Sequence, residues 1–248
     1  MTHSTSKLLL VPNGHWSTPI DQFQEFSPAT LLFAQGSPSY DVFYVERGLV
    51  KLIHQSEDGK ESIIGLWSKG SLLGAASAIV HEPHPITAIT VTRCSLKRIP
   101  TDLFLRLAKT DEEFCWRLHQ AHSREVYQQI SQQVALRSLS ARQRFEKLLL
   151  QFLSSISQIE KQTSVKIRLP LKHWEIAQLI GVTPEHLSRV LRQIMREGAI
   201  QKKDGCMIIS DVHKLYGQEP RTLQTTDLES FTVTRWRSEA EGYQFFFS

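Results

Sequence analysis

Three polar side chains within about one helical turn, Glu185, Ser188 and Arg189, carry the most specific chemistry in this chain. An arginine can donate to the O6 and N7 atoms of one guanine, and a carboxylate can accept from the N4 atom of cytosine. On a helix, residues three and four positions apart project from the same face. The spacing therefore predicts a face that reads DNA bases, if the neighbouring residues fold as a helix and hold it outward.

The flanking residues, 173–198, provide that support. Gly181 stands where the chain must turn, and glycine tolerates the positive φ that tight turns often need. Thr183 is a good N-cap, and Pro184 suits the first position of a helix. Apolar residues recur with helical spacing on both sides of the turn: Ile176, Ala177, Leu179, Ile180, Leu187, Val190, Leu191 and Ile194. This pattern predicts a helix-turn-helix, whose second helix enters the major groove.

The charge distribution supports double-stranded DNA as the partner. Residues 137–221 carry 15 Lys and Arg against 8 Asp and Glu, a balance of +7, within a chain whose net charge is +4. Phosphates attract such a concentration of cations, although chance clustering of solvated lysines gives the same count. Six residues around the motif are candidate contacts to the DNA backbone: Thr183, His186, Lys172, Arg192, Lys202 and Lys203.

Residues 28–100 alternate short β-like runs with turn signals. We expect strands at 31–33, 42–45, 49–53, 62–67 and 86–91. Asp58-Gly59 between two of these runs predicts a hairpin. Many short strands at regular spacing indicate a β-roll of jelly-roll or cupin-like type. Beyond the helix-turn-helix, the runs 199–202 and 206–209 predict a second hairpin, so the motif is expected to be winged.

A long helix is expected from about residue 111 to 136. Residues along it form a seam with coiled-coil spacing: Trp116, Gln120, Ser123, Tyr127, Ile130 and Val134. Leu118, His122 and Val126 form a neighbouring stripe. Because helix-turn-helix proteins usually read two half-sites, we predict that the seam joins two copies and that the stripe faces the β domain. The alternative is a monomeric helix on its own core.

The expected fold class is α+β, with four segments. These are a β-roll effector-sensing domain at 1–110, a dimerisation helix at 111–137, a winged helix-turn-helix at 138–217 and a C-terminal extension of unassigned role at 218–248. No apolar run approaches about eighteen residues and the first residues make no convincing signal peptide, so no membrane association is expected. Cys94, Cys115 and Cys206 are too widely spaced for a disulfide framework and fit a reducing cytoplasm.

The order of β domain, long helix and winged helix resembles the family of the cyclic-AMP receptor protein and the fumarate–nitrate reduction regulator (Crp/Fnr). The likeness covers roughly residues 20–215 and is carried by the segments 43–48 (FYVERG), 57–61 (EDGKE), 69–74 and 183–198. It implies a homodimeric bacterial transcription regulator that senses a small molecule and reads a palindromic operator, with RNA polymerase as a partner. The Glu-x-x-Ser-Arg pattern is similar to the Fnr branch and implies TTGAT-like half-sites.

Departures from the family bear on the effector. The family's cyclic-nucleotide site uses a Gly-Glu pair for the ribose and an Arg-Ser pair for the phosphate. Here Ala75 follows Gly74, and the stretch 84–88 (HPITA) contains no arginine that could bind a buried phosphate. Cyclic AMP is therefore not expected as a cofactor, and neither is an iron–sulfur cluster, because the N-terminal region has no cysteine. The candidate pocket residues are Gly74, Ala75, His84, Thr87 and His122.

Alternatives stay open at this stage. One is a metal-dependent β-roll enzyme of cupin type using His81 and His84, which leaves the winged helix unexplained. Another is a DNA-binding regulator that needs no ligand. His119 or His122 could ligate haem, and Cys94 or Cys115 could respond to oxidation. We expect no catalytic residues and no metal site, and the sequence leaves the effector, the target genes and the sign of regulation unassigned.

Overall fold

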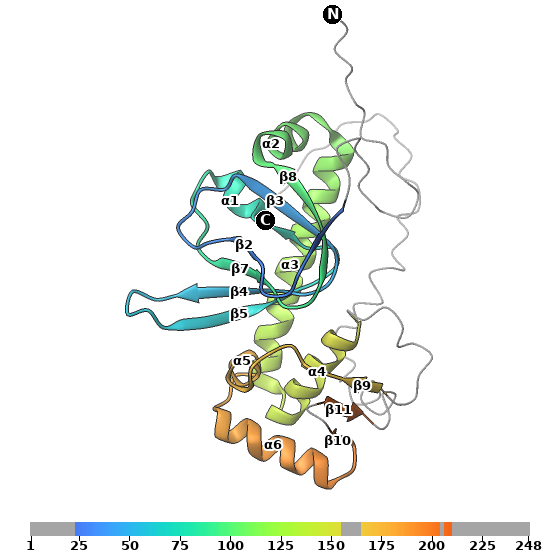
Figure 1. Ribbon diagram of the computed structural model, residues 1–248. Helices are drawn as coiled ribbons and strands as arrows, with labels where there is room; N and C mark the ends of the chain where they lie inside the picture. The colour runs from blue at the N-terminus through green and yellow to red at the C-terminus, as the bar shows by residue number, and fades with distance from the viewer. Residues whose placement is uncertain (1–22, 155–164, 204–205, 210–248) are drawn as a thin grey trace, which may run out of the picture. The chain divides into compact units, whose positions relative to one another are not determined.

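The computed structural model describes residues 23–154, 165–203 and 206–209 (Figure 1). The elements follow the expected order of β domain, long helix and helix-turn-helix domain, which confirms the α+β class. The predicted extension at 218–248 lies outside the described residues. Within the described ranges, no helix combines the length and the apolar character that crossing a membrane requires.

Two four-stranded antiparallel sheets form the β domain. One has the order β1 (Gln24–Phe26), β8 (Cys94–Pro100), β3 (Asp41–Arg47) and β6 (Leu72–Leu73). The other has the order β2 (Leu31–Phe33), β7 (Thr87–Thr90), β4 (Val50–Gln55) and β5 (Glu61–Trp67). Buried residues from both sheets, including Phe43, Leu52, Ala88 and Leu96, share one apolar core. All five predicted strands are present, and the predicted hairpin joins β4 to β5.

Five elements of the β domain escaped the sequence prediction. They are the strands β1, β6 and β8 and the helices α1 (Ala75–Val80) and α2 (Thr101–Thr110). In β8 the charged Lys97 is buried, which hides the alternation of apolar and polar residues that marks a half-buried strand. Helix α1 has six residues and no side-chain cap, so it lacks the start signals on which a prediction depends.

Helix α3 (Glu112–Ser138) confirms the long helix, and Asp111 caps it by accepting a hydrogen bond from the backbone N–H of Phe114 at 2.8 Å. Its inward face, Phe114, Leu118 and Ala121, packs with residues of β3, α1 and α2. The predicted inward stripe is right at Leu118 and wrong at Val126, which is exposed. A stripe that steps by four residues rotates away from the buried face by about 40° at each step, because a helix turns about 100° per residue.

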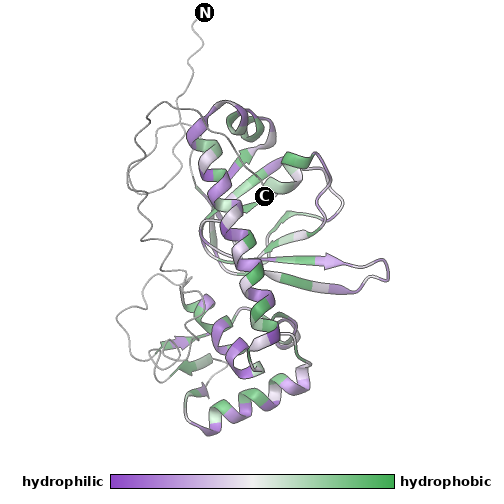
Figure 2. Ribbon diagram, turned by 180° about the vertical axis from the view of Figure 1, so that it is seen from behind, coloured by the Kyte–Doolittle hydropathy of each residue, from purple (hydrophilic) through white to green (hydrophobic). Residues whose placement is uncertain are grey.

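The remaining elements form the predicted winged helix-turn-helix. They are α4 (Ala141–Ser154), β9 (Val165–Ile167), α5 (His173–Leu179), α6 (Pro184–Arg196), β10 (Ile200–Lys203) and β11 (Cys206–Ile209). The three strands pair in the order β10-β11-β9. Fully buried Phe145, Leu149, Leu187 and Ile194 form the centre of the domain. Figure 2 shows polar and apolar residues alternating around α6, as expected of a helix that buries one face.

Candidate nucleic-acid interface

The turn between α5 and α6 is built as the sequence predicts. Gly181 has a φ of 63°, a backbone conformation that favours glycine, and a Cβ there would come within 2.9 Å of a methyl group of the exposed Leu136, which would have to move. The Thr183 hydroxyl accepts a hydrogen bond from the backbone N–H of His186 at 3.3 Å, and Pro184 occupies the first turn. These local contacts fix where α6 begins.

Helix α6 separates its two faces cleanly. Leu187, Val190 and Ile194 are buried in the domain core. Of the predicted base-reading residues, Glu185 and Arg189 are exposed and Ser188 is half-buried. Because these three residues share one helix and the core lies behind it, the structure brings them together on its polar face.

Electrostatics keep the Glu185 carboxylate ionised. Its pKa is lowered first by a hydrogen bond from its own backbone N–H, then by the Thr183 hydroxyl, and further by the nearby Arg189 and His173. An ionised carboxylate only accepts hydrogen bonds, as recognition of a cytosine amino group requires. Among the described residues, the Arg189 side chain has no hydrogen-bond partner, so its donors are available to a base.

The residues predicted to contact the DNA backbone lie on α6 and its cap, at the start of α5 and on β10. Thr183, His186 and Arg192 belong to α6 or its cap, and Arg192 donates to the carbonyl of Ser188 at 3.3 Å. Lys172 is the N-cap of α5 and is exposed. Lys202 and Lys203 lie on the wing strand β10, where Lys202 is exposed. All six residues thus lie within one winged helix-turn-helix.

Arg144 on α4 is a supporting residue that sequence reasoning missed. Its Nε atom donates to the carbonyl of Ile180 at 2.7 Å, in the turn before α6. Its Nη1 atom donates to the carbonyls of Leu139 and Leu136 at 2.7 and 3.2 Å, at the end of α3. Carbonyls at a helix end lack partners within the helix. The Arg144 side chain donates to such carbonyls at the end of α3 and in the turn before α6. An arginine on an amphipathic helix gives no sequence signal for this role.

Glu175 on α5 is a second residue that the sequence analysis did not single out. It is almost fully buried, accepts from the backbone N–H of Lys172 at 2.6 Å, and pairs with the ammonium group of Lys51 on β4 at 2.5 Å. The neighbouring Gln178 accepts from the backbone N–H of Ile63 at 3.0 Å. A buried carboxylate needs such partners, because an unpaired buried charge is strongly destabilising.

In the β domain, the structure brings together Gly74 and His84 of the predicted pocket. Gly74 has a φ of 84°, and a Cβ there would lie 3.1 Å from Cε1 of His84. The His84 ring is 2% exposed and stacks on Phe33, with centroids 3.9 Å apart and planes 16° apart. Ala75 is fully buried beside Gly74. The space next to Gly74 is therefore taken by a side chain of the protein itself.

The other two pocket candidates have different surroundings. The Thr87 hydroxyl accepts from the backbone N–H of Gln35 at 2.9 Å, which is a structural contact. The Nε2 atom of His122 on α3 is buried and has no hydrogen-bond partner among the described residues. Burial lowers the pKa of both His84 and His122, and His119 lowers that of His122 further. Both rings are thus neutral near pH 7 and supply no full positive charge for a phosphate.

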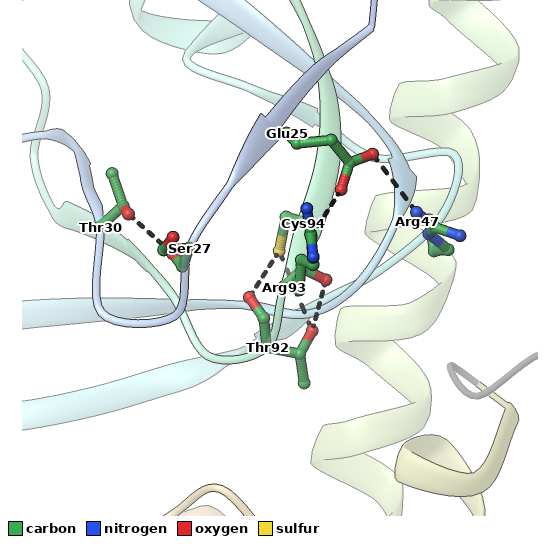
Figure 3. Close-up of polar contacts among 7 residues, drawn as sticks. All are labelled: Glu25, Ser27, Thr30, Arg47, Thr92, Arg93 and Cys94. Carbon is green, nitrogen blue, oxygen red and sulfur yellow. Dashed lines mark hydrogen bonds and ion pairs between the residues drawn. The ribbon is translucent and has the colours of Figure 1, made fainter.

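Cys94 is a structural thiol. It is fully buried, and burial raises its pKa above the ordinary value. Figure 3 shows it beside Thr92, next to the surface pairs that Glu25 makes with Arg47 and Arg93. Because the thiolate is the reactive form, these surroundings disfavour a redox role. No group of three His, Cys, Asp or Glu side chains in the described ranges is placed to hold a metal ion.

Known proteins match both parts of the chain. Residues 23–111 match the family model of the cyclic nucleotide-binding domain, and residues 143–217 match that of the Crp-like helix-turn-helix domain. The transcriptional activatory protein AadR of Rhodopseudomonas palustris is 26% identical over 179 residues, which cover 72% of this chain and 73% of AadR. The transcriptional activator protein anr of Pseudomonas aeruginosa is 27% identical over 169 residues, 68% of each chain.

A solved structure extends the comparison to the fold. A CRP/FNR family transcriptional regulator from Thermus thermophilus superposes with a TM-score of 0.65 at 21% identity, covering 79% of this chain and 97% of that one. The two family models match the β domain and the helix-turn-helix domain described above, and the solved structure shares the fold. The chain belongs to the Crp/Fnr family of DNA-binding transcription regulators and is a transcription factor rather than an enzyme.

Proposed function

We propose that this protein is a cytoplasmic homodimeric regulator that reads an inverted repeat of TTGAT-like half-sites. The observation that carries the proposal is the polar face of α6, where an ionised Glu185 and an exposed Arg189 stand one helical turn apart. A carboxylate and a guanidinium at this spacing suit neighbouring cytosine and guanine edges. Lys172, Arg192, Lys202 and Lys203 supply the charge for the flanking phosphates.

The surface of α3 supports dimerisation. Trp116 and Ile130 are 56% and 55% exposed, and Val134 is also exposed along the same helix. Tyr127 and Ser123 belong to the same predicted seam. Exposed apolar residues that line up along a helix mark an interaction surface. A two-fold axis along this seam would give the dimer two copies of α6, as a palindromic operator requires.

The β domain supports an effector other than cyclic AMP. The guanidinium that would bind the phosphate is missing, Ala75 stands where a ribose-binding carboxylate is expected, and His84 fills the space beside Gly74. This packing also favours a second candidate function, a regulator whose pocket is closed and whose DNA binding needs no ligand. Both candidates share the same operator.

Selection of bound sequences from random DNA tests the proposal, performed with the full chain in the presence and absence of a metabolite extract. We expect an inverted repeat with a TTGAT-like half-site to be enriched. Enrichment that requires the extract indicates an effector, whereas equal enrichment in both arms supports the ligand-independent candidate. Binding without enrichment of any repeat contradicts the proposed function.

A further inference from the structure

A contact between α5 and α6 reaches the base-reading face. The Nε2 atom of His173, the first residue of α5, lies 3.3 Å from the hydroxyl oxygen of Ser188. His173 is exposed and Ser188 is half-buried, so the ring lies at the solvent side of the contact. Neither the local pattern of α5 nor that of α6 predicts this pair, because the two residues are 15 positions apart.

The direction of this hydrogen bond decides what Ser188 offers to DNA. A serine hydroxyl has one hydrogen and two lone pairs. If Ser188 donates to the imidazole, only its lone pairs face the groove, and it can accept from adenine N6 or cytosine N4. If the imidazole N–H donates to Ser188, the hydroxyl keeps its hydrogen for acceptors such as guanine O6 or thymine O4.

Charge next to the contact favours the second arrangement. His173 is one of the groups that lower the pKa of the Glu185 carboxyl, so the ring and this carboxylate lie close enough to interact. A ring N–H on the side of α6 is attracted by the negative charge of Glu185, which favours the tautomer that donates to Ser188 over the one that accepts. Without such a donor, a serine inside a helix tends to direct its hydrogen to the carbonyl four residues earlier, away from the groove.

We propose that His173 is a positioning residue for base recognition, which donates to Ser188 and so turns the Ser188 hydrogen toward a guanine or thymine. The inference rests on the proposed DNA-reading role of α6. His173 acts through Ser188, so its loss changes the preference at the base pair that Ser188 contacts and leaves the preference set by Arg189 intact.

The test measures dissociation constants of the full-length dimer on the selected operator and on its single-base-pair variants. The proteins are the wild type, His173→Phe, His173→Gln, Ser188→Ala and the double variant. We expect His173→Phe and Ser188→Ala to reduce the preference at the same base pair by about two- to tenfold, the range for one neutral hydrogen bond. Glutamine keeps an N–H donor and should restore most of the preference. The double variant should show no further loss at that pair.

Other outcomes separate the possible failures. An equal loss of affinity on every variant of the operator would mean that His173 serves only the backbone or the fold, and would overturn the inference. A change at a different base pair from Ser188→Ala would overturn it as well. If the wild type shows no base preference, the proposed function itself fails. Melting temperatures of all variants, expected to match the wild type, verify that the domain is folded.

Discussion

Helix α6 and the β domain use their polar groups in opposite ways. On α6, Glu185 and Arg189 point away from the core, and the Arg189 donors have no partner among the described residues. In the β domain, His84 is buried against Phe33, and Ala75 replaces the expected carboxylate. The exposed polar groups of α6 are free to contact another molecule, whereas the His84 ring of the β domain packs against other residues of the same chain. This contrast is the basis for the two proposals, that α6 reads DNA and that the β domain does not take cyclic AMP.

The variant with the largest expected effect tests the predicted seam on α3, which would bring two copies of α6 together. Ile130→Glu would place two unpaired carboxylates in the predicted dimer interface, at a cost on the order of several kcal/mol. Ile130 is 55% exposed in the single chain, so the fold should tolerate the change. We expect sedimentation to show a monomer, and binding to the full palindrome to weaken far more than binding to one half-site.

Gln128→Glu provides the matched control for the seam. Gln128 is exposed on the same helix at a position that faces away from the predicted seam, so this variant adds the same charge outside the interface. It should remain dimeric. A dimer mass for the Ile130 variant equal to that of the wild type would rule out this interface.

The second test addresses the predicted pocket around Gly74 and His84 directly. Cyclic AMP binds as an anion, and each lost hydrogen bond to a charged group is worth roughly 1.5–3 kcal/mol. Two missing anchors should weaken binding at least about a hundredfold relative to a complete site. Calorimetry with cyclic AMP and cyclic GMP should show no binding at micromolar ligand. A micromolar dissociation constant together with tighter operator binding would show that this pocket does take a nucleotide.

The third test addresses the exposed polar face of α6. Arg189→Ala should cost about 1–3 kcal/mol of operator binding and relax the preference at one guanine. Arg196→Ala is the control, because Arg196 is an exposed arginine in the last turn of the same helix. Its loss should weaken binding to all sequences alike or leave it unchanged. An equal loss on every sequence for the Arg189 variant would mean that Arg189 touches phosphate only.

Sequence patterns predicted the parts of the molecule whose signals are local. Gly181, Thr183 and Pro184 mark the turn and the start of α6 within four residues, and the exposure of Glu185 and Arg189 follows from helical periodicity. The strand β8 was missed because its buried Lys97 finds its place only in the folded domain.

Contacts between segments that are far apart in the chain could not be predicted from the sequence. His84 meets Phe33 across 51 positions, Arg144 meets Ile180 across 36, and His173 meets Ser188 across 15. No local pattern predicts contacts across such separations in the chain. The motif therefore identified His84 as a pocket residue, but it could not show that the His84 ring packs on Phe33 beside Gly74. The same limit explains why the supporting role of Arg144 emerged only from the fold.

The smallest expected effect concerns protonation of the His84 ring. Burial lowers the pKa of His84, so between the folded and unfolded pKa values the unfolded chain binds more protons at this ring. Stability therefore rises with pH in that window. The contribution is complete above the unfolded value of about 6.5 and is lost as the pH falls through it toward the folded value. Acidification should thus destabilise the β domain by charging a buried ring.

His84→Phe keeps an aromatic ring against Phe33 and removes the titration. We expect the free energy of unfolding, measured with denaturant at several pH values below 7.5, to fall more steeply for the wild type than for this variant. His122, whose pKa is also lowered, contributes in the same direction, and Glu125, whose pKa is raised by burial, contributes in the opposite direction. Both groups are present in the two proteins, so the difference between the curves isolates His84. Parallel curves would show that burial does not hold the ring neutral.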